Sequence, residues 1–213
     1  ISSPVLREYR EKLEIIPIGI NEKFYPVPSE NEMTFVQNIV GENFMLFVGM
    51  FRQYKGLHNL LEAMQGISMN LVIVGKGPLE RELKRHANNL GLTNIHFVGA
   101  VTGVEKVALF KLCRAVVFSS NLRSEAFGVA LIEGLMYGKP LISTEIGTGT
   151  SFVNLDDETG FIVPPNDSIA LRSAIVRIST DLPLSYKMGQ SARLRFEKFF
   201  TGKLMNQKYY DLY

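Results

Sequence analysis

Residues 124–133 read Ser-Glu-Ala-Phe-Gly-Val-Ala-Leu-Ile-Glu and, with the Gly-Lys-Pro at 138–140, decide how this chain folds. An apolar run at 115–118 precedes them, so the pattern predicts a buried strand, a loop and then a helix that ends at the Gly-Lys-Pro. The first turn of a helix carries unpaired N–H groups and a partial positive charge, which together favour phosphate binding. This stretch therefore predicts an anion site at the end of a buried strand.

Two carboxylates, Glu125 and Glu133, stand eight positions apart in this stretch. If the helix begins near Phe127, Glu133 lies about two turns along it, and the two Glu Cα atoms are about 12 Å apart at ~1.5 Å rise per residue. That distance matches the span from hexose to ribose in a nucleotide-sugar, whose diphosphate lies between two sets of hydroxyl groups. The alternative is an ordinary helix start with one Glu near it and a second Glu on the helix surface.

Further apolar runs alternate with helical patterns along the chain, which predicts an α/β fold with a parallel sheet and helices on both faces. Several runs end in Gly, as expected where a ligand crevice lies at the carboxyl ends of the strands. The expected strands are 44–49, 71–75, 95–99, 115–119, 141–144 and 161–163. The expected helices are 57–64, 79–90, 104–113, 127–137, 168–180, 185–199 and 203–213.

The motif Ser124-Glu125-x-Phe127-Gly128, with Glu133 and Gly138-x-Pro140 at fixed spacing, resembles the Glu-x7-Glu motif of retaining glycosyltransferases of the GT-B fold. These group 1 enzymes include bacterial mannosyltransferases. The resemblance covers nearly the whole chain and continues, in the family's order, at 15–20, 24–26, 46–49, 55–56 and 160–165. It implies that the chain is the C-terminal, donor-binding half of a GT-B enzyme, with a Rossmann-like doubly wound parallel sheet.

The sequence pattern and the resemblance together divide the chain into three parts. Residues 1–35 are expected to be an interdomain connecting segment around one short strand at 14–18, and residues 36–200 a nucleotide-sugar-binding Rossmann-like domain. Residues 201–213 are expected to form a C-terminal helix that packs toward a missing N-terminal domain. The alternative for this helix is packing on the domain's own surface.

Lys55 and Gly56 match the end of the family pattern Gly-Arg-x4-Lys-Gly, whose Arg and Lys hold the donor phosphates. Met50 occupies the place of the family Arg, so Arg52, two residues on, is the candidate to reach the same phosphate. A basic loop at the carboxyl end of a strand neutralises a diphosphate through charge-assisted hydrogen bonds. The alternative is a solvated basic loop.

Donor contacts are also expected from the ends of the neighbouring strands. The Gly-Lys-Gly-Pro at 75–78 has Glu80 where a dinucleotide fingerprint needs its third Gly, so it is interpreted as a tight turn that lines the crevice. In the family, the backbone near Val98 and Val101 meets the base; an ordinary buried strand end is the alternative. The full donor-binding set is Glu133, Phe127, Gly128, Val129, Gly49, Gly75, Gly77, Val98 and Val101.

Composition excludes several other classes of protein. A net charge of +2 over 213 residues gives no field that recruits nucleic acid. The single Cys113 cannot form an internal disulfide, which fits a reducing compartment. The histidines show no ligand spacing and the acidic run at 156–158 is typical of a solvated turn, so no metal site is expected. The sequence begins at Ile1, so we expect a piece of a longer protein.

The resemblance implies hexosyl transfer with retention from a nucleotide-sugar, GDP-mannose first, to a saccharide or lipid-linked acceptor. Glu125, Lys55 and Arg52 would be catalytic, and the reaction would need no metal or other cofactor. The expected location is cytoplasmic, or peripheral on the cytoplasmic face of the membrane. The alternatives are a UDP-sugar donor, a non-catalytic nucleotide-binding module and a Rossmann oxidoreductase.

Overall fold

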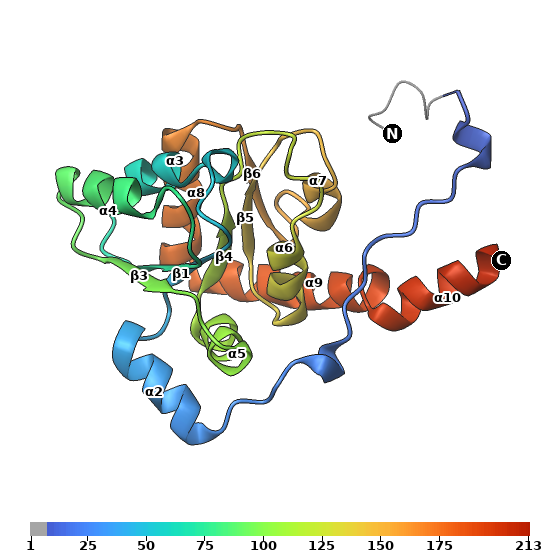
Figure 1. Ribbon diagram of the computed structural model, residues 1–213, viewed down its shortest axis with the longest axis horizontal. Helices are drawn as coiled ribbons and strands as arrows, with labels where there is room; N and C mark the ends of the chain where they lie inside the picture. Colours follow the sequence, from blue (N-terminus) through green and yellow to red (C-terminus); the bar gives the residue numbers. More distant parts are fainter. Residues whose placement is uncertain (1–7) are drawn as a thin grey trace.

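The computed structural model describes residues 8–213, which form a parallel sheet of six strands in the order β3-β2-β1-β4-β5-β6 (Figure 1). All five neighbouring pairs are parallel, so the chain crosses over between successive strands. The order reverses between β1 and β4, as in a doubly wound Rossmann sheet. The strands are β1 Met45–Val48, β2 Leu71–Val74, β3 Ile95–Gly99, β4 Ala115–Phe118, β5 Leu141–Thr144 and β6 Gly160–Val163.

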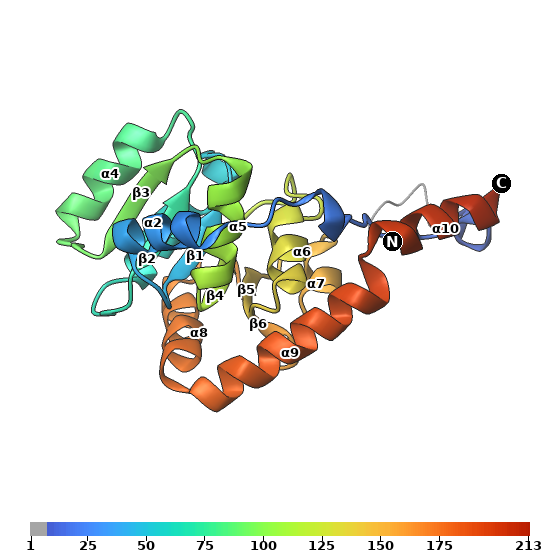
Figure 2. The same cartoon turned by 90° about the horizontal axis from the view of Figure 1, so that it is seen from below.

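Helices cover both faces of the sheet (Figures 1 and 2). One face carries α3, α4 and α8, and the other carries α2, α5, α6 and α9. The helices are α2 Glu30–Val40, α3 Leu57–Ala63, α4 Glu80–Asn89, α5 Gly103–Leu112, α6 Val129–Met136, α7 Thr150–Val153, α8 Ser168–Thr180, α9 Leu182–Phe199 and α10 Gly202–Leu212. Short 3-10 helices are η1 Arg10–Lys12, η2 Glu22–Phe24 and η3 Gln53–Lys55.

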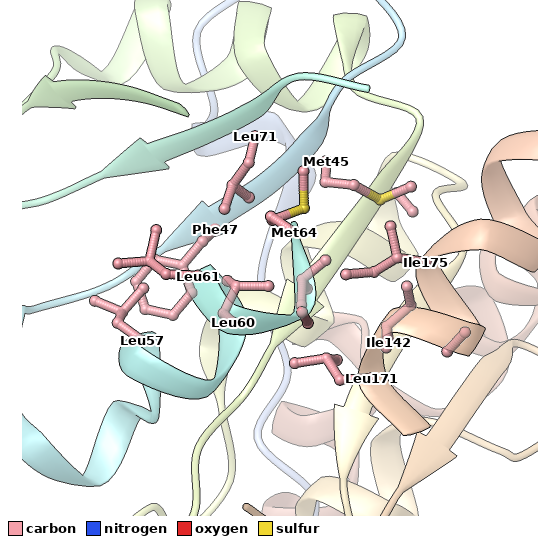
Figure 3. Close-up of a cluster of buried hydrophobic side chains, with 14 of the residues drawn as sticks. Met45, Phe47, Leu57, Leu60, Leu61, Met64, Leu71, Ile142, Leu171 and Ile175 are labelled. Atoms are coloured by element: carbon pink, nitrogen blue, oxygen red, sulfur yellow. The ribbon is translucent and has the colours of Figure 1, made fainter. Parts of the chain in front are cut away.

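The alternation of side chains along each strand divides the hydrophobic core into two layers. In β1, Met45 and Phe47 pack with α3 and α8, whereas Leu46 packs with α5 and α6 on the opposite face. Figure 3 shows the first layer, where Leu60 and Leu61 of α3 lie between strand and helix side chains. Because both faces are covered, β1, β2 and β4 are apolar along their whole length, and the sequence could place them.

The expected strands and crossover helices agree with the structure, with corrections before β1 and around α6. No strand forms at 14–18, where Ile15 and Ile18 are exposed and no neighbouring strand offers hydrogen bonds. A helix that was not expected, α2, runs through the expected boundary at residue 35. The short helix α7, which follows β5, was also not expected.

The connecting segment and α10 lie side by side at one end of the molecule (Figures 1 and 2). Ile20 forms a bridge with Thr201, and the Gly19 N–H donates to Met205 Sδ at 3.2 Å. None of the α10 residues is buried, and Tyr209, Tyr210 and Leu212 are exposed. Across residues 8–213, none of the helices is both long enough and apolar enough to cross a bilayer.

Candidate functional site

The candidate site lies where the strand order reverses, at the carboxyl ends of β1 and β4. In open α/β sheets this switch point leaves a crevice in which ligands bind. The loop after β1 carries Lys55, and the loop after β4 carries Glu125. The backbone N–H of Asn121 donates to Tyr54 O at 2.8 Å, and Ser119 Oγ donates to Lys55 O at 2.9 Å. The two loops are thus fixed to each other across the switch point.

Lys55 and Glu125, seventy positions apart in sequence, form an ion pair through Lys55 Nζ and Glu125 Oε2. Both side chains are largely buried, and Ser120 Oγ donates to the same carboxylate oxygen at 3.4 Å. Lys55 Nζ also lies 4.9 Å from the ring centroid of Phe118, where a cation is attracted to the aromatic face. The two catalytic candidates that the sequence predicted are therefore in direct contact.

Gly56 positions Lys55 at the end of η3. Its backbone is left-handed, with φ at 63°, and a Cβ atom there would lie 2.0 Å from Ser119 O. Only glycine accommodates both the backbone conformation and this close approach. In the Lys-Gly pair, Gly56 is thus required by the loop geometry, and Lys55 supplies the positive charge.

The helix after β4 begins later than expected, at Val129 rather than near Phe127. Gly128 precedes it with φ at 83°, outside helical conformation, and so delays the helix by two residues. Glu133 consequently lies about one turn into α6 rather than two. The N-terminus of α6 still follows directly from the Glu125 loop, so the N–H groups of 127–129 stay candidates to meet an anion.

Glu133 is buried, and its Oε1 atom accepts two hydrogen bonds. Tyr25 Oη donates to it at 2.9 Å, and Lys106 Nζ lies 2.6 Å from it as an ion pair. Burial, and then the charge of Glu133, raise the pKa of the Tyr25 phenol, which therefore stays protonated as a donor. The sequence did not indicate Tyr25 or Lys106, because neither belongs to a motif and only the tertiary fold brings them to Glu133.

The glycines predicted to line the crevice lie together behind Lys55. A Cβ on Gly75, whose φ is 135°, would lie 1.9 Å from Gly49 O, and one on Gly77 would lie 2.5 Å from Phe51 O. The loops after β1 and β2 therefore touch backbone to backbone. The loop after β2 also contacts the end of β3, because the Gly75 N–H donates to Gly99 O at 2.8 Å.

Four of the other candidates lie outside this group of contacts. Arg52 is exposed, and its Nε donates to Met50 Sδ at 3.3 Å, so in this structure it is not part of the Lys55–Glu125 pair. The side chains of Val98 and Val101 line a cavity of about 440 Å³ together with Phe35 of α2. Phe127 packs edge-on against Phe200, 6.2 Å between ring centroids.

Within residues 8–213, no group of three or more His, Cys, Asp or Glu side chains could hold a metal ion. Asp156 instead accepts a hydrogen bond from the backbone N–H of Ile162 at 2.8 Å. Asp157 has a left-handed backbone conformation in an exposed turn. The acidic run at 156–158 is thus a turn, as expected.

Comparisons with known proteins agree with this architecture. A family model described as "Glycosyl transferases group 1" matches residues 29–195. The chain is 48% identical over 201 residues to the D-rhamnosyltransferase WbpZ of Pseudomonas aeruginosa, covering 94% of this chain and 53% of that protein. It is 46% identical over 212 residues to the O-antigen chain mannosyltransferase C of Escherichia coli, covering 100% of this chain and 57% of that protein.

Among solved structures, the sucrose-phosphate synthase of Thermosynechococcus elongatus is similar, with a TM-score of 0.83 and 28% identity over 98% of this chain and 54% of that one. The chain spans about half the length of the curated relatives it matches. Its sheet is the Rossmann-like C-terminal half of the GT-B fold. The chain belongs to the group 1 glycosyltransferases.

Proposed function

We propose that this chain supplies the donor site of a glycosyltransferase that moves a hexosyl group from a nucleotide-sugar to a saccharide or lipid-linked acceptor. The observation that carries the proposal is the contact between Lys55 and Glu125 at the switch point of the sheet, in front of the N-terminus of α6. A cation, a carboxylate and free helix N–H groups in one crevice suit a ligand that has both a diphosphate and hydroxyl groups.

On this proposal the donor takes over the partners of the ion pair. Lys55 Nζ exchanges the Glu125 carboxylate for the diphosphate, whose charge grows as the glycosidic bond breaks. The released Glu125 carboxylate accepts hydrogen bonds from sugar hydroxyls, and the N–H groups of 127–129 meet the phosphate oxygens. Arg52 contributes if its exposed side chain turns from Met50 toward the diphosphate. These groups stabilise the leaving group without a metal ion, and the anomeric configuration is retained.

Mannose is the sugar that we propose, with GDP-mannose as the donor and a UDP-sugar as the alternative. The sequence identity of 46% to a mannosyltransferase and of 48% to a D-rhamnosyltransferase supports this choice, since both names denote transfer of a hexose or a deoxyhexose. The acceptor site would lie in a partner domain that is not part of this chain. The full-length protein would act in the cytoplasm or at the cytoplasmic face of the membrane.

The test is a transfer assay on the full-length protein with GDP-mannose and with UDP-sugars, with the product anomer read by NMR. We expect transfer from GDP-mannose with retention, and a loss of about a hundredfold in kcat for Glu125→Gln, since hydrogen bonds to the sugar strengthen in the transition state. Glu82→Gln is the matched control, because Glu82 pairs with His58 on the surface and should leave kcat unchanged. Inversion, or full activity of Glu125→Gln, would refute the proposed mechanism, and no transfer from any donor would favour a non-catalytic module.

A further inference from the structure

Three separate parts of the chain meet at the carboxylate of Glu133. Tyr25 comes from the connecting segment, Lys106 from α5, and Glu133 from the first turns of α6. Tyr25 and Glu133 are 108 positions apart in sequence, so only the folded chain brings them together. The Glu133 side chain is 5% exposed and that of Lys106 is 31% exposed, so the carboxylate is the buried member of the pair.

Both hydrogen bonds go to the same oxygen. Tyr25 Oη and Lys106 Nζ approach Oε1 at 2.9 and 2.6 Å, and within residues 8–213 no donor reaches Oε2. Oε2 is not sealed off either, because the buried side-chain polar atoms without a partner in this part of the chain are His86 Nε2, Arg114 Nε and Asn121 Oδ1. One carboxylate oxygen is thus held, and the other is left as an acceptor.

The two donors are themselves held in place. The Tyr25 ring packs edge-on against Tyr137, with 6.4 Å between centroids, and Lys106 Nζ lies 5.4 Å from the Tyr25 ring centroid. Tyr137 in turn stacks on Phe110 of α5 at 5.5 Å. A buried carboxylate with fixed donors on one oxygen has few orientations available, so its second oxygen points in a defined direction.

We propose that Tyr25 and Lys106 are positioning residues that orient Glu133 so that its Oε2 atom accepts a hydrogen bond from a ribose hydroxyl of the bound nucleotide. The proposal rests on the proposed function, since it requires a nucleotide in the crevice. It gives the connecting segment a part in donor binding, because Tyr25 reaches the site from outside the sheet. Neither residue needs to touch the ligand.

The test is calorimetric titration of the chain with GDP and with 2′,3′-dideoxy-GDP, which lacks the ribose hydroxyls. We expect Tyr25→Phe and Lys106→Met each to weaken GDP binding at least about fivefold, the scale of one ordinary hydrogen bond. Both substitutions should have no effect on dideoxy-GDP binding, and no further effect on GDP binding in a Glu133→Gln background. Lys106→Arg should retain the wild-type affinity for GDP, because it keeps the cation.

Matched controls separate this effect from general loss of structure. Tyr186→Phe changes an exposed tyrosine, and Lys84→Met breaks an exposed ion pair with Glu80, so both should leave GDP binding unchanged. Equal losses for GDP and dideoxy-GDP, or undiminished losses in the Glu133→Gln background, would overturn the positioning role. If the wild-type protein binds none of GDP, UDP and ADP, the proposed function and this inference are overturned together. If the wild-type protein prefers UDP, the same titrations are done with UDP and 2′,3′-dideoxy-UDP in place of the guanine nucleotides.

Discussion

At the scale of single residues, the site depends on a lysine and a glutamate that are largely buried and satisfy each other. A buried pair of this kind contributes little net stability, but each member depends on the other because an unpaired buried charge is costly. Each member of the pair thus satisfies the other's charge until a ligand with its own anion and hydroxyls takes its place. On the proposed function, this explains how a carboxylate can lie beside an anion site before the ligand arrives.

Substitution of Lys55 tests that arrangement. We expect Lys55→Ala to weaken nucleoside-diphosphate binding by more than about 1.5 kcal/mol, about tenfold, because it removes a charge-assisted contact and frees the Glu125 charge. Calorimetry measures the affinity, and a thermal melt shows that the variant is folded. Lys84→Ala, on the exposed surface of α4, is the control. Unchanged affinity in Lys55→Ala would remove this lysine from the site.

The left-handed glycine beside the lysine gives a second prediction at this scale. We expect Gly56→Ala to lower the free energy of unfolding by about 2 kcal/mol more than Gly66→Ala, the range found for overpacking. Both glycines have a positive φ, but a Cβ on Gly56 would meet Ser119 O, whereas one on Gly66 would meet nothing within 4 Å. Denaturant midpoints of the two variants give the comparison. Equal destabilisation would mean that the loop after β4 can move away from η3.

At the scale of elements, α2 begins with a capping box. The Ser29 side chain accepts from the Glu32 N–H, and the Glu32 carboxylate accepts from the Ser29 N–H at 2.8 Å. The Ser29 N–H and then the Ser29 hydroxyl, which also donates to the Glu32 carboxylate, lower the pKa of Glu32. The stability that the Glu32 charge contributes is therefore present above the carboxyl's usual pKa and is lost as the pH falls through the lowered value. The cap therefore weakens in acid.

We expect Ser29→Ala to cost about 1 kcal/mol of stability near neutral pH, the usual cost of a lost N-cap. Ser173→Ala is the control, since Ser173 is exposed inside α8 and alanine favours helix there. Urea unfolding of both variants at neutral and acid pH measures the difference. A cost for Ser29→Ala that stays the same in acid would show that the box does not depend on the Glu32 charge.

The sequence predicted these elements to different degrees. Both faces of the central strands are covered, so these strands appear as short apolar runs that a pattern can place. The helix α2 was missed because the prolines before it indicated a linker, although the Ser29 and Glu32 spacing was visible. The predicted start of α6 was wrong, because Gly128 takes a left-handed backbone conformation and the helix begins only after it. Lys55 and Glu125 follow from motif and position, whereas Tyr25 and Lys106 depend on tertiary packing that no local pattern records.

At the scale of the whole molecule, the chain has two hydrophobic core layers of its own and, on the proposed function, would supply one side of a catalytic cleft. Its relatives are about twice as long, and α10 extends from the sheet with exposed Tyr209, Tyr210 and Leu212. We propose that this face of α10 packs toward the missing N-terminal domain. The chain alone is then expected to bind nucleotide but to give negligible transfer, as a turnover assay beside the full-length protein would measure. Robust turnover by the chain alone would contradict the assignment of the donor and acceptor sites to two separate domains.

The most direct test of the proposed donor site is a calorimetric titration of this chain with GDP, UDP and ADP under identical conditions. We expect saturable binding at one site, tightest for GDP, because the crevice at the β1–β4 switch point is proposed to be complete for the nucleotide without the other domain. Tightest binding of UDP would change the donor but not the site. Absence of binding for all three nucleotides would contradict the central claim that this chain is the donor half of a glycosyltransferase.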